Sequence, residues 1–174
     1  MAFERLGGRV AFDGRIARVR VDRFRFDDGE EAEREIVEHP GSVAVVAHDR
    51  ERVYLVRQPR EAVEEPALLE LPAGKLDEEG ESVLETAKRE LAEEVGKAAA
   101  DWEPLMRVFL SPGFSDEECH LFLATGLRDE RAQAADNERI EIVAEPLSEL
   151  ERLIADCRDA KTVIGLLLLR ERLR

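Results

Sequence analysis

The segment RELAEEVG, residues 89–96, places three glutamates beside one arginine. If it forms a helix, Glu90, Glu93 and Glu94 lie on nearly one side, because residues three and four apart are helical neighbours. Their like charges then repel one another by about 0.2–0.5 kcal/mol per pair. Such a side is either simply solvated or faces a cation. Carboxylate oxygens without nitrogen or sulfur ligands select hard cations such as Mg²⁺ or Mn²⁺.

The surrounding residues predict the helix that would position these glutamates. Ser82 is a candidate N-cap, and Glu85 three residues later completes a capping box. Gly96 is a candidate terminator of the helix. An apolar stripe would face the core, and it consists of Val83, Leu84, Ala87, Leu91 and Val95.

A loop that contains Gly74 comes before this helix, and its backbone carbonyls could bend toward the same cations. Two or more such ions can bridge a diphosphate, neutralise its charge and activate a water molecule. Joint spacing of the glycine, glutamates and arginine over this stretch favours such a site over a solvated helix face.

The composition excludes several classes of protein. The chain has 174 residues, of which 44% are hydrophobic and 38% are charged, and this suits one soluble domain. A formal net charge of −14 argues against nucleic acid and anionic membranes as partners. Cys119 and Cys157 lack metal-ligand spacing, and the N-terminus has no signal-peptide core. The apolar run VIGLLLL is too short to span a membrane, so we expect a cytoplasmic protein with reduced thiols.

The order of elements predicts a mixed sheet flanked by helices. Period-two alternation over residues 8–39 indicates strands around an Asp-Gly turn at residues 27–31. SVAVVAHD and RVYLVRQ indicate two strands joined by a turn at Asp49, the first of them buried on both faces. Further strands are expected at PLMRVFLSPGF and CHLFLATGL, around a Ser-Pro-Gly loop, and at IEIVAEPL. SELERLIADCRD indicates a helix, and KTVIGLLLLRERL indicates a second helix or its continuation.

Residues 74–97 resemble the Nudix box, G-x5-E-x7-R-E-U-x-E-E-x-G-U, where U is a bulky apolar residue. The matching positions include Arg89, Glu90, Leu91, Glu93, Glu94 and Gly96, and seven residues separate Glu81 from Arg89. There are two departures: six residues instead of five separate Gly74 from Glu81, and Lys97 occupies the last apolar position. The resemblance implies an α+β Nudix fold, with a mixed β-sheet sandwiched between helices and an N-terminal antiparallel sheet.

The flanking segments resemble the ADP-ribose pyrophosphatase branch of this family over about residues 14–170. They are EREIVEHPGSVAVV, LVRQPR, ELPAGKLD and SPGFSDEECHLFLATGL. Pro112 matches the marker proline of the branch, whereas Pro59 stands where the branch usually has tyrosine. The resemblance implies hydrolysis of ADP-ribose to AMP and ribose 5-phosphate by a homodimer with two or more Mg²⁺ or Mn²⁺ ions. It also implies an N-terminal strand region, residues 1–40, for substrate or dimer contacts, and a hydrolase domain, residues 41–174.

The resemblance assigns metal-binding and catalytic roles. Metal ligands would be the carbonyl of Ala73 and the carboxylates of Glu90, Glu93 and Glu94, with Arg89 orienting the glutamates. Glu93 and Glu94 would also be catalytic.

A late acidic loop would supply one more catalytic carboxylate, from Asp136 or from Glu138. Glu138 would bind metal if it takes that role. The alternative for both residues is a solvated loop.

Substrate contacts follow from the same resemblance. Arg57 is a candidate phosphate contact, because a guanidinium fork suits phosphate oxygens, and Arg60 is a second substrate contact. An ordinary surface arginine is the alternative for Arg57. Other implied contacts are Glu117 at the terminal ribose, Arg34 and Glu35 at the adenosine pocket, and Pro112.

Three other residues invite a functional reading. His39 and His120 fit structural roles, because neither has a metal-type partner. Trp102 fits packing as well as base stacking.

Other functions stay open on the sequence. The box does not distinguish ADP-ribose from another nucleoside diphosphate sugar such as GDP-mannose, or from NADH or FAD. A module that binds ADP-ribose without cleaving it would lack glutamates of the box, and here all are present. A plain acidic scaffold would not explain the flanking motifs.

Overall fold

The computed structural model describes residues 2–130 and 139–174. These residues form two compact units. Unit 1 contains the chain up to Gly41 together with Phe109–Glu118. Unit 2 contains Ser42–Val108 and Cys119–Arg174.

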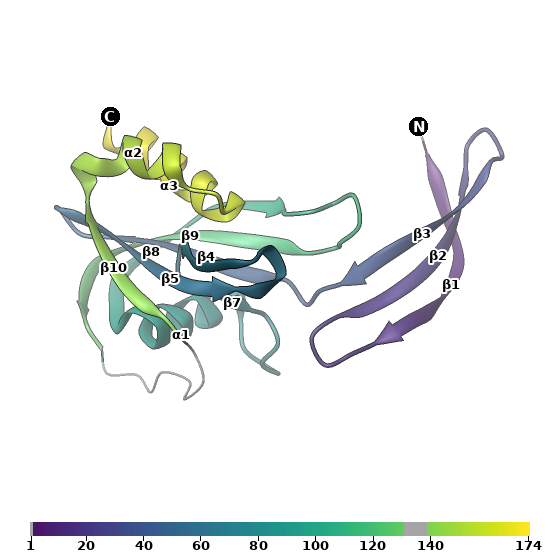
Figure 1. Ribbon diagram of the computed structural model, residues 1–174, viewed down its shortest axis with the longest axis horizontal. Coiled ribbons are helices and arrows are strands. Elements are labelled where there is room, and N and C mark those ends of the chain that lie inside the picture. The colour runs from purple at the N-terminus through teal and green to yellow at the C-terminus, as the bar shows by residue number, and fades with distance from the viewer. Residues whose placement is uncertain (1, 131–138) are drawn as a thin grey trace. The chain divides into compact units, whose positions relative to one another are not determined.

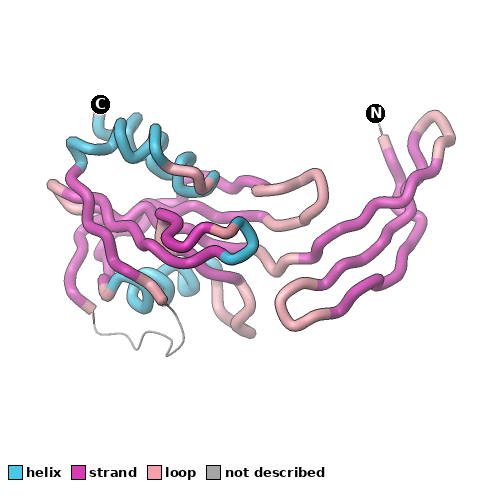
Figure 2. The backbone as a smooth tube through the Cα atoms, in the orientation of Figure 1, coloured by secondary structure: helices cyan, strands magenta, loops and turns pink. Residues whose placement is uncertain are grey.

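Unit 1 is built on a three-stranded antiparallel sheet, in the order β1-β2-β3 (Figure 2). The strands are β1 (Phe3–Asp13), β2 (Arg18–Phe26) and β3 (Glu31–Glu38). The predicted turn between β2 and β3 is confirmed, and Gly29 takes a φ of 87° there, which glycine adopts without strain. The segment Phe109–Glu118 adds to this unit, because the Val37 amide of β3 donates to the Phe114 carbonyl at 2.7 Å.

One buried carboxylate fastens β1 to β2. Asp22 is fully buried, and Arg5 binds it with Nε at 2.7 Å and Nη2 at 2.9 Å. The hydrogen bonds from Arg5 hold the pKa of Asp22 below its ordinary value, although burial acts to raise it. Gly8 lies opposite Asp22, and a Cβ there would be 2.0 Å from the Asp22 Oδ1 atom.

Unit 2 contains a seven-stranded mixed sheet with the path β10-β5-β4-β9-β8, while β6 pairs with β5 and β7 with β4. β4 runs parallel to β9 and antiparallel to β5 and β7. The strands are β4 (Ser42–His48), β5 (Arg52–Arg60), β6 (Glu65–Glu70), β7 (Ala73–Lys75), β8 (Lys97–Phe109), β9 (Glu118–Asp129) and β10 (Glu141–Pro146).

Helices cover both faces of this sheet (Figure 1). α1 (Val83–Val95) packs on one face, and α2 (Leu150–Asp156) and α3 (Ala160–Leu173) lie on the other. β4 is apolar from Val43 to Ala47 because these residues face helices on both sides: Val43 and Val45 contribute to the core under α1. Val46 faces Gly165 of α3. The predicted mixed sheet between helices, with an antiparallel N-terminal sheet, is confirmed.

The ends of α1 are also as predicted. The Ser82 hydroxyl accepts from the Glu85 amide, the Glu85 carboxylate accepts from the Ser82 amide, and Gly96 ends the helix with a φ of 68°. Two 3₁₀ turns, Glu61–Val63 and Leu147–Glu149, lead into β6 and α2. None of the helices formed by residues 2–130 and 139–174 has the length and apolar character that a membrane span needs.

β6 and β7 were not expected from the sequence. Their segment, EPALLELPAGK, contains two prolines and charged residues that weaken a strand pattern. Pairing with β5 and β4 provides the missing stabilisation, which is a tertiary effect that local propensity does not contain.

The loop between β6 and β7 depends on one hydroxyl of α3. Thr162 is fully buried, and its Oγ1 atom accepts a hydrogen bond from the Leu71 amide at 2.7 Å. Thr162→Val keeps the shape but leaves this buried amide without its acceptor, so we expect a loss of about 1–3 kcal/mol in the free energy of unfolding. Urea denaturation measures it. The same substitution at the half-buried Thr125 of β9 is the control, and equal losses in both variants would contradict the prediction.

Candidate functional site

Arg89 holds the acidic side of α1 together. Its Nη1 atom donates to the Glu90 Oε1 atom at 2.7 Å and to the Glu93 Oε2 atom at 3.1 Å. Its Nε atom donates to the Glu81 Oε1 atom at 3.1 Å, and its Nη2 atom donates to the Glu81 Oε2 atom at 3.1 Å. The hydrogen bonds to Glu81, then the charge of Glu90 and the hydrogen bonds to Glu90 and Glu93, raise the pKa of Arg89. One guanidinium thus offsets the repulsion among three carboxylates.

Glu81 is part of this arrangement, although its own role was missed from the sequence. It precedes the N-cap of α1 and folds back over the helix, where Thr86 Oγ1 donates to Glu81 Oε2 at 3.0 Å. The hydrogen bonds from Arg89 and Thr86 lower the pKa of Glu81, so it stays an anion that anchors the guanidinium. The spacing between Glu81 and Arg89 was a usable signal, because residues that start a helix can reach its second and third turns.

The Ala73–Gly74 stretch of β7 lies directly against these glutamates. The Ala73 amide donates to the Glu94 Oε2 atom at 2.9 Å. A Cβ on Gly74 would be 2.0 Å from the Glu90 Oε1 atom, so only glycine allows Glu90 to lie there. The structure therefore brings together Ala73, Arg89, Glu90, Glu93 and Glu94, the whole set predicted from the box.

The extra residue between Gly74 and Glu81 falls in the turn after β7. Gly80 takes a φ of 84°, and the Glu81 amide donates to the Glu78 carbonyl at 3.3 Å. Because the turn contains the insertion, Gly74 still contacts Glu90 and Glu81 still contacts Arg89.

Lys97, the second departure from the box, lies over the ring of Tyr54 at 5.2 Å and donates to Asp129 at 2.6 Å. Its charge is satisfied away from the glutamates of the box.

The donor set suits a hard cation. Glu90, Glu94 and the Ala73 backbone offer only oxygen ligands, and the missing side chain of Gly74 leaves Glu90 close to this stretch. Among residues 2–130 and 139–174, no three acidic, histidine or cysteine side chains already form a metal-binding group. Arg89 engages Glu90 and Glu93, and the Ala73 amide engages Glu94, so the carboxylates point at these donors. Cation binding would require them to reorient, and the metal-ligand roles stay a prediction.

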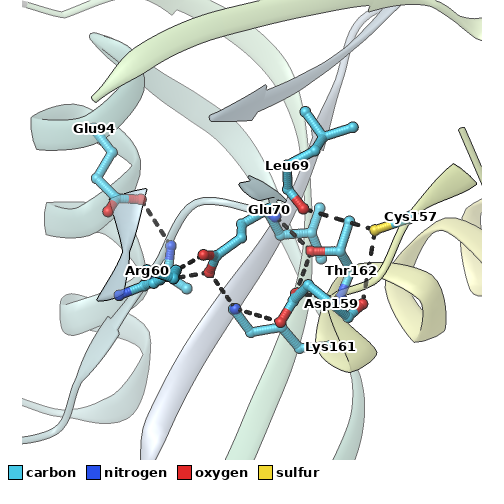
Figure 3. Close-up of polar contacts among 10 residues, drawn as sticks. Arg60, Leu69, Glu70, Glu94, Cys157, Asp159, Lys161 and Thr162 are labelled. Atoms are coloured by element: carbon cyan, nitrogen blue, oxygen red, sulfur yellow. Dashed lines mark hydrogen bonds and ion pairs between the residues drawn. The ribbon is translucent and has the colours of Figure 1, made fainter. Parts of the chain in front are cut away.

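The two predicted arginine contacts of β5 have different surroundings. Arg60 makes a two-point ion pair with Glu70, with Nε at 2.5 Å from Oε1 and Nη2 at 2.8 Å from Oε2 (Figure 3). Arg57 is more loosely held, with its Nη1 atom 4.0 Å from the Glu141 carboxylate, and its side chain is 37% exposed. Arg57 can therefore turn to a ligand more easily than Arg60 can.

The remaining described candidates belong to unit 1. Arg34, Glu35 and Pro112 line one pocket of about 340 Å³. Phe24 and Phe26 contribute its aromatic part, and the Arg34 guanidinium lies 5.9 Å from the centre of the Phe26 ring. The Glu117 amide donates to Ser115 Oγ in the loop that follows Pro112, but Glu117 does not line the pocket.

Two of the other residues named from the sequence, Trp102 and His39, have structural contacts. Trp102 packs edge-on against Phe122 in unit 2, with ring centres 6.4 Å apart, which supports the packing interpretation. His39 has a structural contact, since its Nδ1 atom accepts from the Gly41 amide at 3.1 Å. Asp136 and Glu138 lie outside the described residues.

Gly74 offers a direct test of the site geometry. In Gly74→Ala the new methyl group would displace the Glu90 carboxylate, so we expect Mn²⁺ to bind about tenfold more weakly. Electron paramagnetic resonance titration of bound Mn²⁺ measures the affinity. Gly113→Ala is the matched control, because a Cβ at Gly113 meets nothing within 4 Å. Unchanged Mn²⁺ affinity in Gly74→Ala would show that Glu90 is not where a cation binds.

Comparison with known proteins agrees with this geometry. The NUDIX domain model matches residues 38–164. The chain is 40% identical to a methanol dehydrogenase activator of Bacillus methanolicus, covering 88% of this chain and 85% of the relative. It is 36% identical to an ADP-ribose pyrophosphatase of Bacillus subtilis, covering 89% and 85%. A crystal structure of an ADP compounds hydrolase superposes with a TM-score of 0.87 at 27% identity, covering 99% of this chain and 95% of that one. The chain belongs to the Nudix hydrolase family.

Proposed function

We propose that the chain is a Mg²⁺-dependent pyrophosphatase that hydrolyses ADP-ribose to AMP and ribose 5-phosphate. The main support is the acidic side of α1, where Arg89 gathers Glu81, Glu90 and Glu93, and Glu94 contacts the Ala73 amide. An all-oxygen set of this kind suits the divalent cations that accompany diphosphates. A relative named ADP-ribose pyrophosphatase and a solved structure titled as an ADP compounds hydrolase support the substrate class.

In this proposal the residues of unit 2 act mainly by position and charge. Glu90, Glu94 and the Ala73 carbonyl would hold the cations, with Glu93 beside them, and Arg89 would keep the glutamates aligned. When bound, Mg²⁺ would neutralise the diphosphate and make water a better nucleophile. Glu93, Glu94 or a carboxylate of the late loop, Asp136 or Glu138, would accept the proton of the attacking water.

The pocket of unit 1 suits a purine nucleoside. Phe24 and Phe26 offer aromatic surface for stacking, and Arg34 and Glu35 offer one donor group and one acceptor group. A base with both an amino group and ring nitrogens, such as adenine, matches this pair. The predicted adenosine contact of Arg34 and Glu35 therefore remains our proposal for this pocket.

A homodimer remains the expected assembly. Phe12 and Ile16 of unit 1 are 58% and 75% exposed, so their apolar surface is available to a partner subunit. Light scattering after size-exclusion chromatography measures the mass.

Glu94→Gln tests the proposed chemistry. The amide keeps the size of the side chain but loses the charge that a cation needs, so we expect kcat for ADP-ribose to fall by about 10²–10⁴. Released AMP is quantified with Mg²⁺ present, in parallel with GDP-mannose, NADH and FAD as substrates. Glu103→Gln, a surface substitution on β8, is the control and should retain activity.

Three outcomes would contradict parts of the proposal. Turnover of Glu94→Gln equal to that of the unmodified chain would refute the role of Glu94. Faster turnover of GDP-mannose, NADH or FAD than of ADP-ribose would support the proposed hydrolysis but refute ADP-ribose as the preferred substrate. Binding of ADP-ribose without cleavage would indicate a sensing module.

The 40% sequence identity to a methanol dehydrogenase activator favours a second candidate function, which is the activation of a dehydrogenase. Adding the chain to a methanol dehydrogenase and following NADH formation tests it. Activation by the unmodified chain but not by Glu94→Gln would mean that both functions use the same glutamate.

A further inference from the structure

A second cluster of charges, centred on a buried carboxylate, lies in unit 2 close to Glu94 of α1 (Figure 3). Its centre is Glu70, the last residue of β6, whose side chain is only 1% exposed. Arg60 binds both carboxylate oxygens of Glu70 from β5. Lys161 of α3 binds the Oε2 atom at 2.5 Å, and its own side chain is 11% exposed.

The N-terminus of α3 anchors this cluster. Asp159 accepts from the Lys161 ammonium at 2.9 Å and from the Thr162 amide at 3.0 Å. Thr162 in turn accepts from the Leu71 amide, next to Glu70. Two residues further on, the Ala73 amide binds Glu94. The stretch from Glu70 to Ala73 is thus attached to α3 at one end and to a predicted metal ligand at the other.

Glu70 and Lys161 stay ionised although both are largely buried. Burial acts to raise the pKa of Glu70, but Arg60 and Lys161 together lower it below its ordinary value. Burial acts to lower the pKa of Lys161, but Asp159 and Glu70 raise it. Burying ions is expensive, and well-packed apolar residues in their place are often at least as stable. Stability alone therefore does not explain the cluster.

The orientation of Arg60 suggests a use. The pair with Glu70 occupies the Nε and Nη2 atoms, so the Nη1 side of the guanidinium lies outside that pair. The side chain is 43% exposed, which allows contact with a solute. The hydrogen bonds to Glu70 raise the pKa of Arg60, and the nearby charge of Glu94 adds to that effect. Arg60 is therefore a fixed cation beside a predicted metal ligand.

We propose that Glu70 and Lys161 are positioning residues that hold Arg60 in the orientation needed to bind a diphosphate beside Glu94. This inference rests on the proposed function. The Glu70 carboxylate fixes the plane of the Arg60 guanidinium by accepting two hydrogen bonds from it, and Lys161 keeps that carboxylate from rotating by donating to its Oε2 atom. A guanidinium held in one orientation loses less side-chain entropy when it binds phosphate than a mobile one does.

The test compares Glu70→Gln, Arg60→Gln and the double variant, with Glu103→Gln as the matched control. Glu103 also pairs with an arginine, Arg172 at 2.7 Å, but on the surface. Glu70→Gln keeps the size of the side chain and removes the charge that orients Arg60. We expect kcat/KM for ADP-ribose to fall about tenfold, mainly through KM, and the double variant to be no worse than Arg60→Gln alone.

Binding of α,β-methylene-ADP, which is not cleaved, gives a second readout by calorimetry. We expect its Kd to rise about tenfold in Glu70→Gln and by a smaller factor in the same direction in Lys161→Gln. Circular dichroism selects a temperature at which every variant is folded. If Glu70→Gln does not fold, the Kd of the analogue for Lys161→Gln tests the inference by itself.

Several outcomes would overturn the inference: unchanged KM and Kd in the folded variants, additive losses in the double variant, or an unmodified chain that does not bind the analogue. A chain that binds the analogue with the expected losses but does not cleave ADP-ribose would support the inference and refute the proposed function.

Discussion

The arrangement of the site depends on one guanidinium surrounded by carboxylates. Arg89 donates to Glu81, Glu90 and Glu93, and without it three anions would repel one another on and beside α1. The same contacts decide where each carboxylate points. A helix with this composition would otherwise gain by spreading its glutamates into solvent. Arg89 therefore makes an acidic helix side into an ordered set of carboxylates.

The sheet of unit 2 supplies the second constraint, because it fixes what lies opposite α1. β4 is buried between helices, and β7 pairs with it so that Ala44 stands opposite Ala73. That pairing places Ala73 and Gly74 against Glu94 and Glu90. On the other face, α3 holds the start of the same stretch through Thr162 and Lys161. Two helices on opposite faces of the sheet thus position one short backbone segment.

The sequence was most informative where local signals agree. The capping box at Ser82, the apolar stripe and the terminating glycine predicted α1 and its glutamates, and the unbroken apolar run of β4 predicted burial on both faces. Long-range pairing was not predictable: β6 and β7 form only because β5 and β4 are present. The role of Glu70 and the attachment of Phe109–Glu118 to unit 1 depend on tertiary contacts, which spacing along the chain does not reveal.

The central claim is that divalent cations bind the acidic side of α1. The most direct test measures the melting temperature of the unmodified chain and of Glu94→Gln over a series of Mg²⁺ concentrations, at constant ionic strength. A ligand that binds only the folded state stabilises it progressively as its concentration passes the Kd. The claim predicts a melting temperature that rises with Mg²⁺ in the unmodified chain and rises much less in Glu94→Gln. The same melting temperature at every Mg²⁺ concentration in the unmodified chain would contradict it.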